Sequence, residues 1–542
     1  MELGEATALI HSFPYDEEQH QKSKPDLVRP RRSSLSKSMR LALSRFKRQQ
    51  KVRSRIFAPG TLGPTRPESA ELSSSAHGGF FLWNLMFAQI GSKSSEKQLL
   101  GTRSLRRVLL QDEASSVLER LDSQVLSLLT SFLLRFYEPD LQREAAWCLA
   151  TLSSTSSDFI ARVVKANAIQ NLTQVLGTEH VARQATWCLG NIAAESAKFR
   201  DLVIQNKAMP LLLQNLRPDA EASMFRTTVW TISNICKVKP IPPIEELTDA
   251  LVILTKLLHH SDNEILTDAL VAVSSISDAQ GGGTQALIAT GAVPRLVELL
   301  GHEDRSILTY ALRSTGNIAT GKDSETQTVI DAGLFSKLPR LLVMEHVRLR
   351  REATWTLSNI TAGNVHQIEE AMASGVMQLI IDRMGGETQS VKAEICWVLS
   401  NATMRGSQEQ ITRLVEIGCC EALSVFLEFA GYNEPPGLLP SEASHVGLSC
   451  LNRIANTGRR IAKLSNTDKY NVFQDELTAL AIWPRLLQLA EDRQDLHALS
   501  IVKFTLAPAS PWTDFRVRQS LRKSIKKLTT SKGFKLILPC YS

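Results

Sequence analysis

A short stretch of apolar and polar positions recurs along the chain, and in each full copy a Trp is followed four residues later by an Asn. The full copies are ATWCLGNIAA at 185–194, TVWTISNICK at 228–237, ATWTLSNITA at 353–362 and ICWVLSNATM at 395–404. Residues four apart share one face of a helix, so Trp187 and Asn191 lie together. Leu189 and Ile192 occupy another side, and this apolar side must pack inside the fold. The pattern therefore predicts helices whose Trp/Asn side lines a surface.

The copies return at a nearly constant interval. Three incomplete copies replace one or both of these residues, and their pairs are Trp147 and Thr151, Val271 and Ser275, and Arg313 and Asn317. From one copy to the next, the Trp places are separated by 40, 43, 41, 42, 42 and 42 residues. We therefore predict an all-α, right-handed superhelical solenoid of about ten stacked repeats, because such periods are typical of helical repeat arrays. Stacking in register would align the pairs as a ladder along one groove.

The ladder has a definite binding chemistry. An Asn amide offers two N–H donors and one oxygen acceptor, so a row of amides can hold the main chain of an extended peptide. Parallel indole rings take the aliphatic stems of Lys or Arg, and each cation–π contact contributes about 0.5–2 kcal/mol. Acidic residues beside the ladder would favour basic peptides. The alternative is that each Trp is ordinary core, but the recurring Asn and the separate apolar side argue against it.

Composition excludes several classes of function. The chain of 542 residues has no apolar run that approaches the ~18–20 residues of a membrane-spanning helix. Its eight cysteines form no CxxC or Cys/His ligand pattern. We therefore expect buried, reduced thiols, no metal, no cofactor and no insertion into a membrane. The GGG at 281–283 lacks the lysine of a phosphate-binding loop, and the eleven histidines are scattered, so we expect no enzyme.

Charge is distributed unevenly. The net charge of +7 combines +8 over residues 1–66, +7 over residues 513–542 and −8 over the rest. Between Val28 and Ile56 there are eleven basic residues and no acidic one, and apolar residues at helical spacing in this segment predict a basic amphipathic helix. An acidic body with basic tails can bind its own tails or basic partners. The predicted segments are a disordered start at 1–28, the basic segment at 29–57, a Pro/Gly/Ser linker at 58–80, the repeat array at 81–507 and a basic tail at 508–542.

Three stretches carry a resemblance to a known family. They are ALRSTGNIATGKDSETQTVIDAG at 311–333, ATWTLSNITAGN at 353–364 and SNATMRGSQEQITRLVEIG at 400–418. Together with Arg313 and Asn317 in the sixth repeat, they resemble importin-α, the armadillo-repeat adaptor family that carries basic nuclear localisation signals. The resemblance extends over residues 83–506. It implies an armadillo-repeat nuclear import adaptor of cytoplasm and nucleus that binds basic cargo and importin-β, with an exportin for recycling.

In that family, two stretches of the ladder hold basic clusters. Carried over residue by residue, the minor site comprises Arg313, Asn317, Asp323, Thr326, Glu352, Trp355, Asn359, Glu394, Trp397 and Asn401. The major site comprises Trp147, Gln184, Trp187, Asn191, Glu195, Trp230 and Asn234. The major site departs from the family, because Thr155, Ile160 and Glu195 stand where the family has Gly, Thr and Asp around its key lysine. We therefore predict that basic clusters are read mainly through the minor site.

The basic segment at 29–57 stands where the family has its importin-β-binding region. The resemblance implies this role for Arg40, Arg45, Lys47, Arg48, Lys51, Arg53 and Arg55. The stretch at 470–492 resembles the tenth repeat, which implies the exportin contact. The basic tail at 508–542 does not resemble the family's acidic tail.

Two alternatives to an import adaptor stay open. The first is an armadillo protein-interaction scaffold that has lost transport, which the replaced residues Thr151, Ile160 and Val271 favour. The second is direct binding of the basic tails to nucleic acid or a membrane surface, which would depend steeply on salt. The adaptor is favoured over both, and nucleic acid is not among the expected partners.

Overall fold

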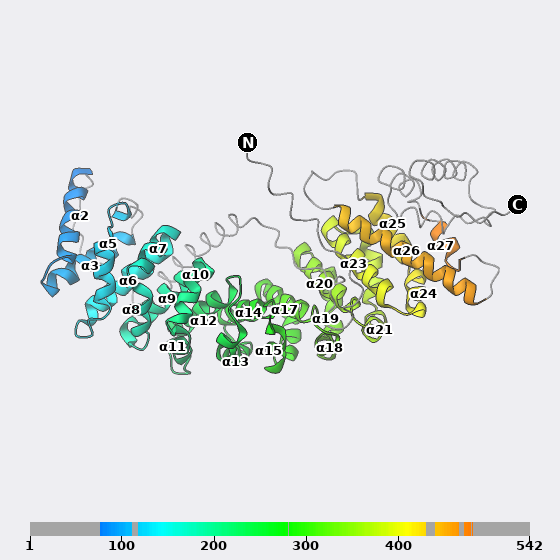
Figure 1. Ribbon diagram of the computed structural model, residues 1–542, viewed down its shortest axis with the longest axis horizontal. Helices are drawn as coiled ribbons and strands as arrows, with labels where there is room; N and C mark the ends of the chain where they lie inside the picture. The colour runs from blue at the N-terminus through cyan, green and yellow to red at the C-terminus, as the bar shows by residue number, and fades with distance from the viewer. Residues whose placement is uncertain are drawn as a thin grey trace, which may run out of the picture. The chain divides into compact units, whose positions relative to one another are not determined.

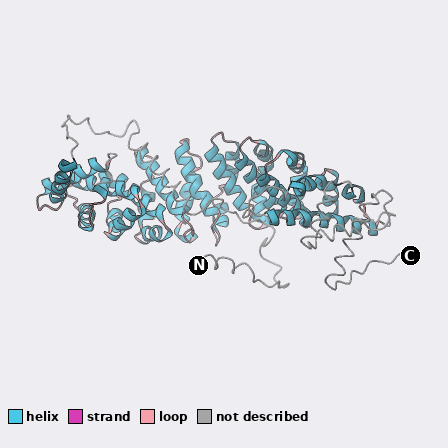
Figure 2. Cartoon of the chain, turned by 90° about the horizontal axis from the view of Figure 1, so that it is seen from above, coloured by secondary structure: helices cyan, strands magenta, loops and turns pink. Residues whose placement is uncertain are grey.

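The computed structural model is all-helical in the part of the chain that it describes, which confirms the predicted fold class. The described residues are 76–110, 117–279, 281–429, 440–465, 471–478 and 480. The predicted start, the basic segment at 29–57 with its seven importin-β-binding residues, and the tail at 508–542 lie outside them. Figure 2 shows the described chain as helices joined by short turns. The number of repeats stays a prediction.

The described residues fall into two compact units. The first unit lies within Pro30–Ile318 and Asp331–Lys337, and the second within Ala319–Ile330 and Leu338–Ser542. In the described residues, seven long helices carry the predicted pairs. They are α6 (Pro139–Thr155), α9 (Glu179–Glu195), α12 (Ala222–Lys237), α14 (Asn263–Ser277), α17 (Arg305–Ile318), α20 (Val347–Thr361) and α23 (Gln389–Arg405).

Consecutive long helices contact each other within each unit (Figure 1). In the first unit, α3 (Ser95–Leu109) packs on α6, and contacts continue through α9, α12, α14 and α17. In the second unit, α20 packs on α23, and α23 packs on α26 (Pro440–Leu464). The apolar side predicted from the sequence faces these contacts, since Leu189 and Ile192 are completely buried.

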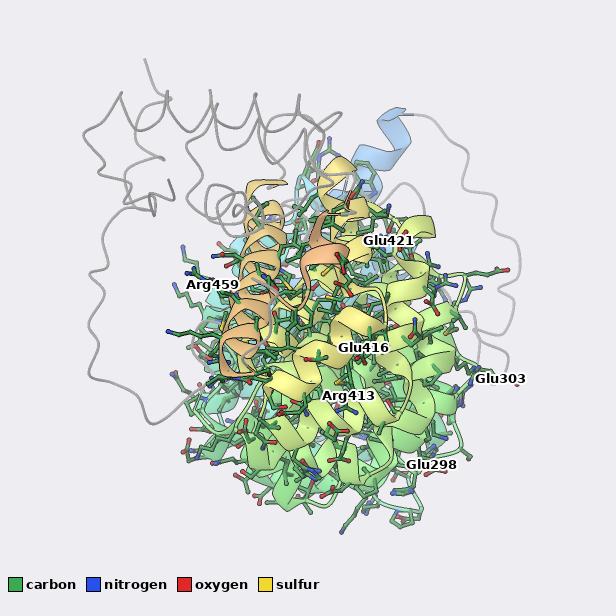
Figure 3. The ribbon with its side chains drawn as sticks, turned by 90° about the vertical axis from the view of Figure 1, so that its right-hand side faces the viewer. Glu298, Glu303, Arg413, Glu416, Glu421 and Arg459 are labelled. Atoms are coloured by element: carbon green, nitrogen blue, oxygen red, sulfur yellow. The ribbon has the colours of Figure 1, made fainter. Side chains whose placement is uncertain are left out.

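Further helices complete the repeats. They are α2 (Ala76–Ile90), α5 (Ser123–Phe132), α7 (Ser157–Lys165), α8 (Ala168–Gln174), α10 (Ala197–Gln205), α11 (Ala208–Gln214), η1 (Ile244–Glu246), α13 (Thr248–Leu257), α15 (Gly283–Ala289), α16 (Val293–Glu298), η2 (Leu299–Gly301), α18 (Asp323–Asp331), α19 (Leu334–Val343), α21 (Val365–Ala373), α22 (Val376–Arg383), η3 (Met384–Gly386), α24 (Gln408–Glu416), α25 (Cys419–Phe429) and α27 (Gln474–Thr478). Charged side chains of α24 and α25, among them Arg413, Glu416 and Glu421, lie on the outside of the helices (Figure 3). None of the described helices is long and apolar enough to cross a membrane.

Within the described residues, a residue with a positive φ angle turns the chain between short helices in six places. These residues are Asn167, Lys207, Gly291, Gly333, Gly375 and Gly418. Glycine adopts this left-handed conformation without a Cβ clash, which explains why most of the turns use it. The side chains of Ser156, Ser196, Asn364 and Ser407 accept hydrogen bonds from backbone N–H groups and so start the helices that follow these residues.

The first described helix begins earlier than the sequence predicts. α2 starts at Ala76, so the predicted linker at 58–80 overlaps it. The predicted boundary rests on the aromatic run from Phe80, whereas the helix takes in the preceding turn as well.

Candidate peptide-binding surface

The tryptophans of the ladder are only partly accessible. Trp147, Trp187 and Trp397 are half-buried, whereas Trp230 and Trp355 are each 7% exposed. The sequence predicts a surface lined by whole indole faces, but the structure exposes only part of each ring. Neighbouring long helices pack closely enough to cover the rest. Gly190 illustrates this closeness, because a Cβ built there would lie 2.5 Å from Cζ3 of Trp230.

The asparagines of the ladder are buried and tie each long helix to the one before it. The Nδ2 groups of Asn191, Asn234, Asn317 and Asn401 donate to the main-chain oxygens of Ala150, Gly190, Ser274 and Ser358, at 3.4, 3.2, 3.2 and 2.8 Å. In each case the acceptor is the residue just before the Asn place of the preceding long helix. The prediction that both N–H donors are available to a peptide is therefore wrong for these amides, because one N–H holds the stack together.

The oxygens of three of these amides lack a partner. Oδ1 of Asn191, Asn234 and Asn401 is buried and accepts no hydrogen bond within the described residues. An unsatisfied buried acceptor costs about 1–3 kcal/mol, so a recurring one calls for an explanation. Two of these oxygens lie on consecutive long helices of the first unit and one on a long helix of the second, and a side-chain movement that uncovers them would let them accept N–H groups from an extended chain.

Acidic and polar residues stand three positions before the Trp place. Glu352 is half-buried, and Glu394 and Gln184 are buried. We call the residue at this position, together with those at the Trp and Asn places of the same helix, a rung. Carboxylates on the rungs of α20 and α23 supply the charge that would attract Lys or Arg side chains.

The three residues that the sequence predicts around the lysine of the major site make contacts within the protein. The Thr155 hydroxyl donates to the main-chain oxygen of Leu152 at 2.8 Å, and Ile160 is only 2% exposed. The Glu195 carboxylate accepts a hydrogen bond from the Ser157 hydroxyl. Ile160 therefore belongs to the core and offers no oxygen to a lysine.

The polar residues predicted for the minor site are held by the scaffold. In the second unit, the completely buried Thr326 hydroxyl donates to the main-chain oxygens of Ala319 and Lys322, each at 3.2 Å. Asp323 is exposed at the start of α18. In the first unit, Arg313 is half-buried with its guanidinium carbon 5.5 Å from the centre of the Tyr310 ring, and Asn317 is buried. On α20, Asn359 is completely buried.

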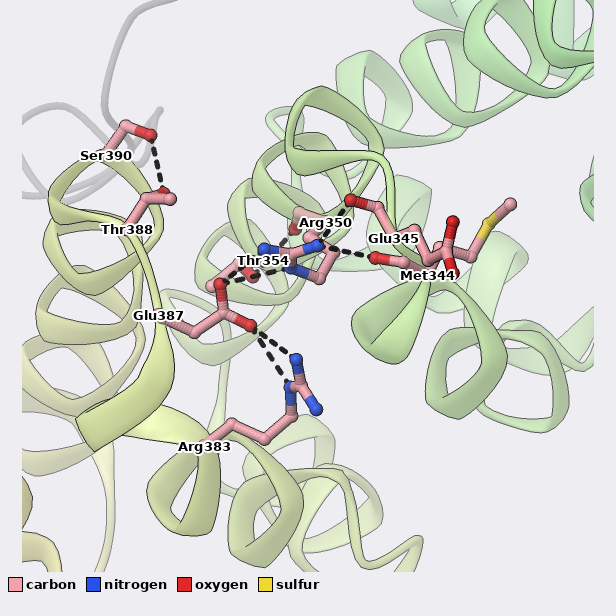
Figure 4. A network of polar contacts seen from close by, with 8 residues as sticks. All are labelled: Met344, Glu345, Arg350, Thr354, Arg383, Glu387, Thr388 and Ser390. Carbon is pink, nitrogen blue, oxygen red and sulfur yellow. Dashed lines mark hydrogen bonds and ion pairs between the residues drawn. The ribbon is translucent and has the colours of Figure 1, made fainter.

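A buried ion network positions α20, which carries Trp355 and Asn359 (Figure 4). The Arg350 guanidinium donates through Nε and Nη2 to one Glu387 oxygen, at 3.0 and 2.9 Å, and Arg383 donates to the other at 3.1 and 2.9 Å. Arg350 Nη1 also donates to the main-chain oxygens of Met344 and Glu345. The network fastens the start of α20 to the turn that precedes α23.

Sequence reasoning missed Arg453 on α26. Its Nη2 group donates to the main-chain oxygen of Ser400 at 3.1 Å, and Ser400 directly precedes the Asn place of α23. Arg453 thus makes the same tie that the asparagines make on earlier helices. The interval to Asn401 is 52 residues, longer than the period, so counting along the sequence does not find it.

The cysteines in the described residues are all buried. Burial raises the pKa of the Cys188 and Cys236 thiols to about 12. At neutral pH both are therefore uncharged thiols packed between helices, and neither has the thiolate character of a nucleophile.

The fold and the ladder define a class of protein, the armadillo-type helical solenoids. The armadillo/beta-catenin-like repeat family matches residues 282–320 and 323–362. A crystal structure of an engineered protein is similar, with a TM-score of 0.65 and 22% identity, over 79% of this chain and 99% of that one. At this identity the likeness shows the fold alone.

Known proteins with a similar sequence are importin-α subunits. Importin subunit alpha-1b of Oryza sativa subsp. japonica is 36% identical over 212 residues, which are 39% of this chain and 40% of that protein. Importin subunit alpha-B of Dictyostelium discoideum is 41% identical over 207 residues, 38% of this chain and 40% of that protein. The matched part thus spans about 40% of the length of these relatives. Over the matched residues, the chain is thus similar both to armadillo repeats and to importin-α subunits.

The close contact at Gly190 gives a prediction for the ladder. Gly190→Ala is expected to displace the Trp230 ring and to lower the free energy of unfolding by about 1–3 kcal/mol, because the added methyl group overpacks this contact. Chemical denaturation and near-ultraviolet circular dichroism would measure both effects. Gly177→Ala is the control, since a Cβ there meets nothing within 4 Å. Equal stability of the two variants would contradict the prediction.

Proposed function

We propose that the chain is a nuclear import adaptor that binds basic localisation-signal peptides along the ladder and links them to importin-β. The observation that carries the proposal is an unpartnered Oδ1 atom that recurs on Asn191 and Asn234 in the first unit and on Asn401 in the second, on helices that also carry partly exposed indole rings. These oxygens suit the main-chain N–H groups of a peptide whatever its side chains are. The similarity to importin-α subunits supports the same function.

In this proposal, the second unit binds basic residues more strongly than the first unit does. Glu352 and Glu394 stand on the rungs of Trp355 and Trp397, so each of these rungs combines an aromatic ring with a carboxylate. On α9 the corresponding residue is the uncharged Gln184, and the pocket that Ile160 helps to form has lost a hydroxyl. Basic side chains therefore gain more binding free energy on α20 and α23 than on α9 and α12.

The partners follow from the same proposal. Importin-β binds the basic segment at 29–57, an exportin binds near 470–492, and the protein moves between cytoplasm and nucleus. Binding, rather than catalysis, is the role that the ladder serves.

The proposal is tested by titrating the full-length protein with a fluorescein-labelled peptide that carries two Lys/Arg clusters. Fluorescence anisotropy is expected to give a dissociation constant in the micromolar range or tighter. The matched control is the same peptide with Gln in place of each Lys and Arg, which should not bind. Pull-down with purified importin-β tests the second partner. Absence of binding to the basic peptide would favour the scaffold that has lost transport.

A further inference from the structure

The rung on α6 is filled by side chains of the neighbouring helix α3. The Glu144 carboxylate, three positions before Trp147, accepts hydrogen bonds from Nε of Arg103 at 3.2 Å and from Nε of Arg106. The side chains of Glu144 and Arg106 are only 12% and 16% exposed. This carboxylate is therefore already neutralised within the protein and has little attraction left for a basic ligand.

The aromatic ring of the same rung is also occupied. The guanidinium carbon of Arg106 lies 5.4 Å from the centre of the Trp147 ring, within the range of a cation–π contact. The indole Nε1 group of Trp147 is buried and makes no hydrogen bond with the described residues. A Lys or Arg from a peptide would have to displace Arg106 before it could use this ring.

The Asn place of this rung is closed as well. Thr151 stands there, is 6% exposed, and its hydroxyl donates to the main-chain oxygen of Trp147 at 2.9 Å. On α9, by contrast, Asn191 keeps an unpartnered oxygen. The α6 rung thus lacks an amide oxygen, and its ring and its carboxylate are both engaged by arginines of α3.

The two arginines occupy ladder positions of their own. Arg106 lies 41 residues before Trp147, which is one period of the repeat, and Arg103 lies three residues before Arg106. They are therefore the equivalents, on α3, of Trp147 and Glu144. At this end of the ladder two guanidinium groups face one carboxylate, so the local charge is positive. Arg103 is 38% exposed and bonds Glu144 through Nε. Its Nη groups make no hydrogen bond within the described residues, so they are available to an acceptor on a ligand.

We infer that Arg103 and Arg106 prevent a basic side chain from binding at the α6 rung. As a consequence, this end of the ladder selects peptides whose basic cluster is flanked by an acidic residue rather than by a further Lys or Arg. The inference rests on the proposed function and adds a sequence preference to it. A peptide carboxylate beside the cluster pairs with Arg103, whereas a peptide ammonium group meets two positive charges and a covered ring.

Three labelled peptides test the inference with the full-length protein. They share one basic cluster and carry Glu, Gln or Lys on both flanks, so the direction in which the peptide lies does not matter. The wild-type protein is expected to bind the Glu-flanked peptide about fivefold more tightly than the Lys-flanked one. Arg106→Gln should abolish or reverse this preference, because it frees the Trp147 ring and half of the pairing of Glu144.

Arg107→Gln is the matched control, since Arg107 is exposed on the same helix and next in sequence. It should keep the wild-type preference. Glu144→Gln provides an independent variant, which should increase the preference for the Glu-flanked peptide because it removes the carboxylate that neutralises the arginines. Thermal melting would establish that each variant is folded.

Equal binding of all three peptides by the wild-type protein would overturn the inference while leaving the proposed function intact. An equal change of preference in Arg106→Gln and Arg107→Gln would overturn it too, because it would indicate a general effect of net charge. If none of the peptides bound, the proposed function itself would fail, and the inference with it.

Discussion

Glu387→Ala is expected to lower the free energy of unfolding of the second unit by about 3–5 kcal/mol. The Glu387 side chain is 2% exposed and pairs with Arg350, which is 11% exposed, and with Arg383. Removing the carboxylate leaves a buried guanidinium group without its counter-charge, and the energetic cost of that burial exceeds the loss of ordinary hydrogen bonds. It also frees the start of α20, which carries Trp355.

Urea denaturation followed by far-ultraviolet circular dichroism would measure this loss. Because the repeats of a solenoid can unfold in parts, the transition of each unit should be fitted separately. Glu416→Ala is the control, because Glu416 is an exposed residue of α24 in the same unit, and its replacement should change stability by less than about 0.5 kcal/mol. A Glu387→Ala protein as stable as this control would show that the network does not hold α20 in place.

The double variant Trp355→Ala with Trp397→Ala is expected to weaken binding of a basic peptide by about 100-fold. Two cation–π contacts of up to about 2 kcal/mol each would be lost, and a tenfold change corresponds to about 1.4 kcal/mol. The corresponding double variant of Trp187 and Trp230 should lose less, because no carboxylate stands three residues before either tryptophan. Anisotropy titration with the same labelled peptide compares the two.

Packing must be separated from binding in this comparison. Trp355 is 7% exposed, so its truncation also leaves a cavity, whereas Trp397 is half-buried and its truncation should disturb the core less. Trp397→Ala alone should therefore weaken binding by roughly tenfold with a nearly unchanged melting curve. A larger loss of binding from the Trp187 and Trp230 pair would contradict the assignment of the main contacts to the second unit.

The period of the sequence predicted the fold well. The spacing from Trp147 to Trp397 placed every pair on a long helix, and the apolar side at Leu189 and Ile192 is the buried side. Local spacing is sufficient for this purpose, because helix period and apolar side are properties of neighbouring residues. One further step of the same period would have reached Arg106 and so revealed the rung on α3.

Other features of the candidate site could not be predicted. The burial of Asn191 and its bond to Ala150 depend on how closely two helices about 40 residues apart approach each other. In the same way, Arg350 and Glu387 look like ordinary surface charges in the sequence, and only packing makes them a buried pair. The occupied ring of Trp147 likewise follows from contact between α3 and α6.

The ties made by the asparagines bear on how such an array can change over generations. Each joins a side-chain donor to a main-chain oxygen, and a main-chain oxygen is present whatever residue the preceding helix carries. A duplicated or exchanged repeat can therefore pack on its new neighbour without a matching mutation. The Trp place can differ without loss of the tie, because Arg313 occupies it on α17 while Asn317 of the same helix still donates to Ser274. The contacts between neighbouring repeats and the choice of ligand can thus diverge independently.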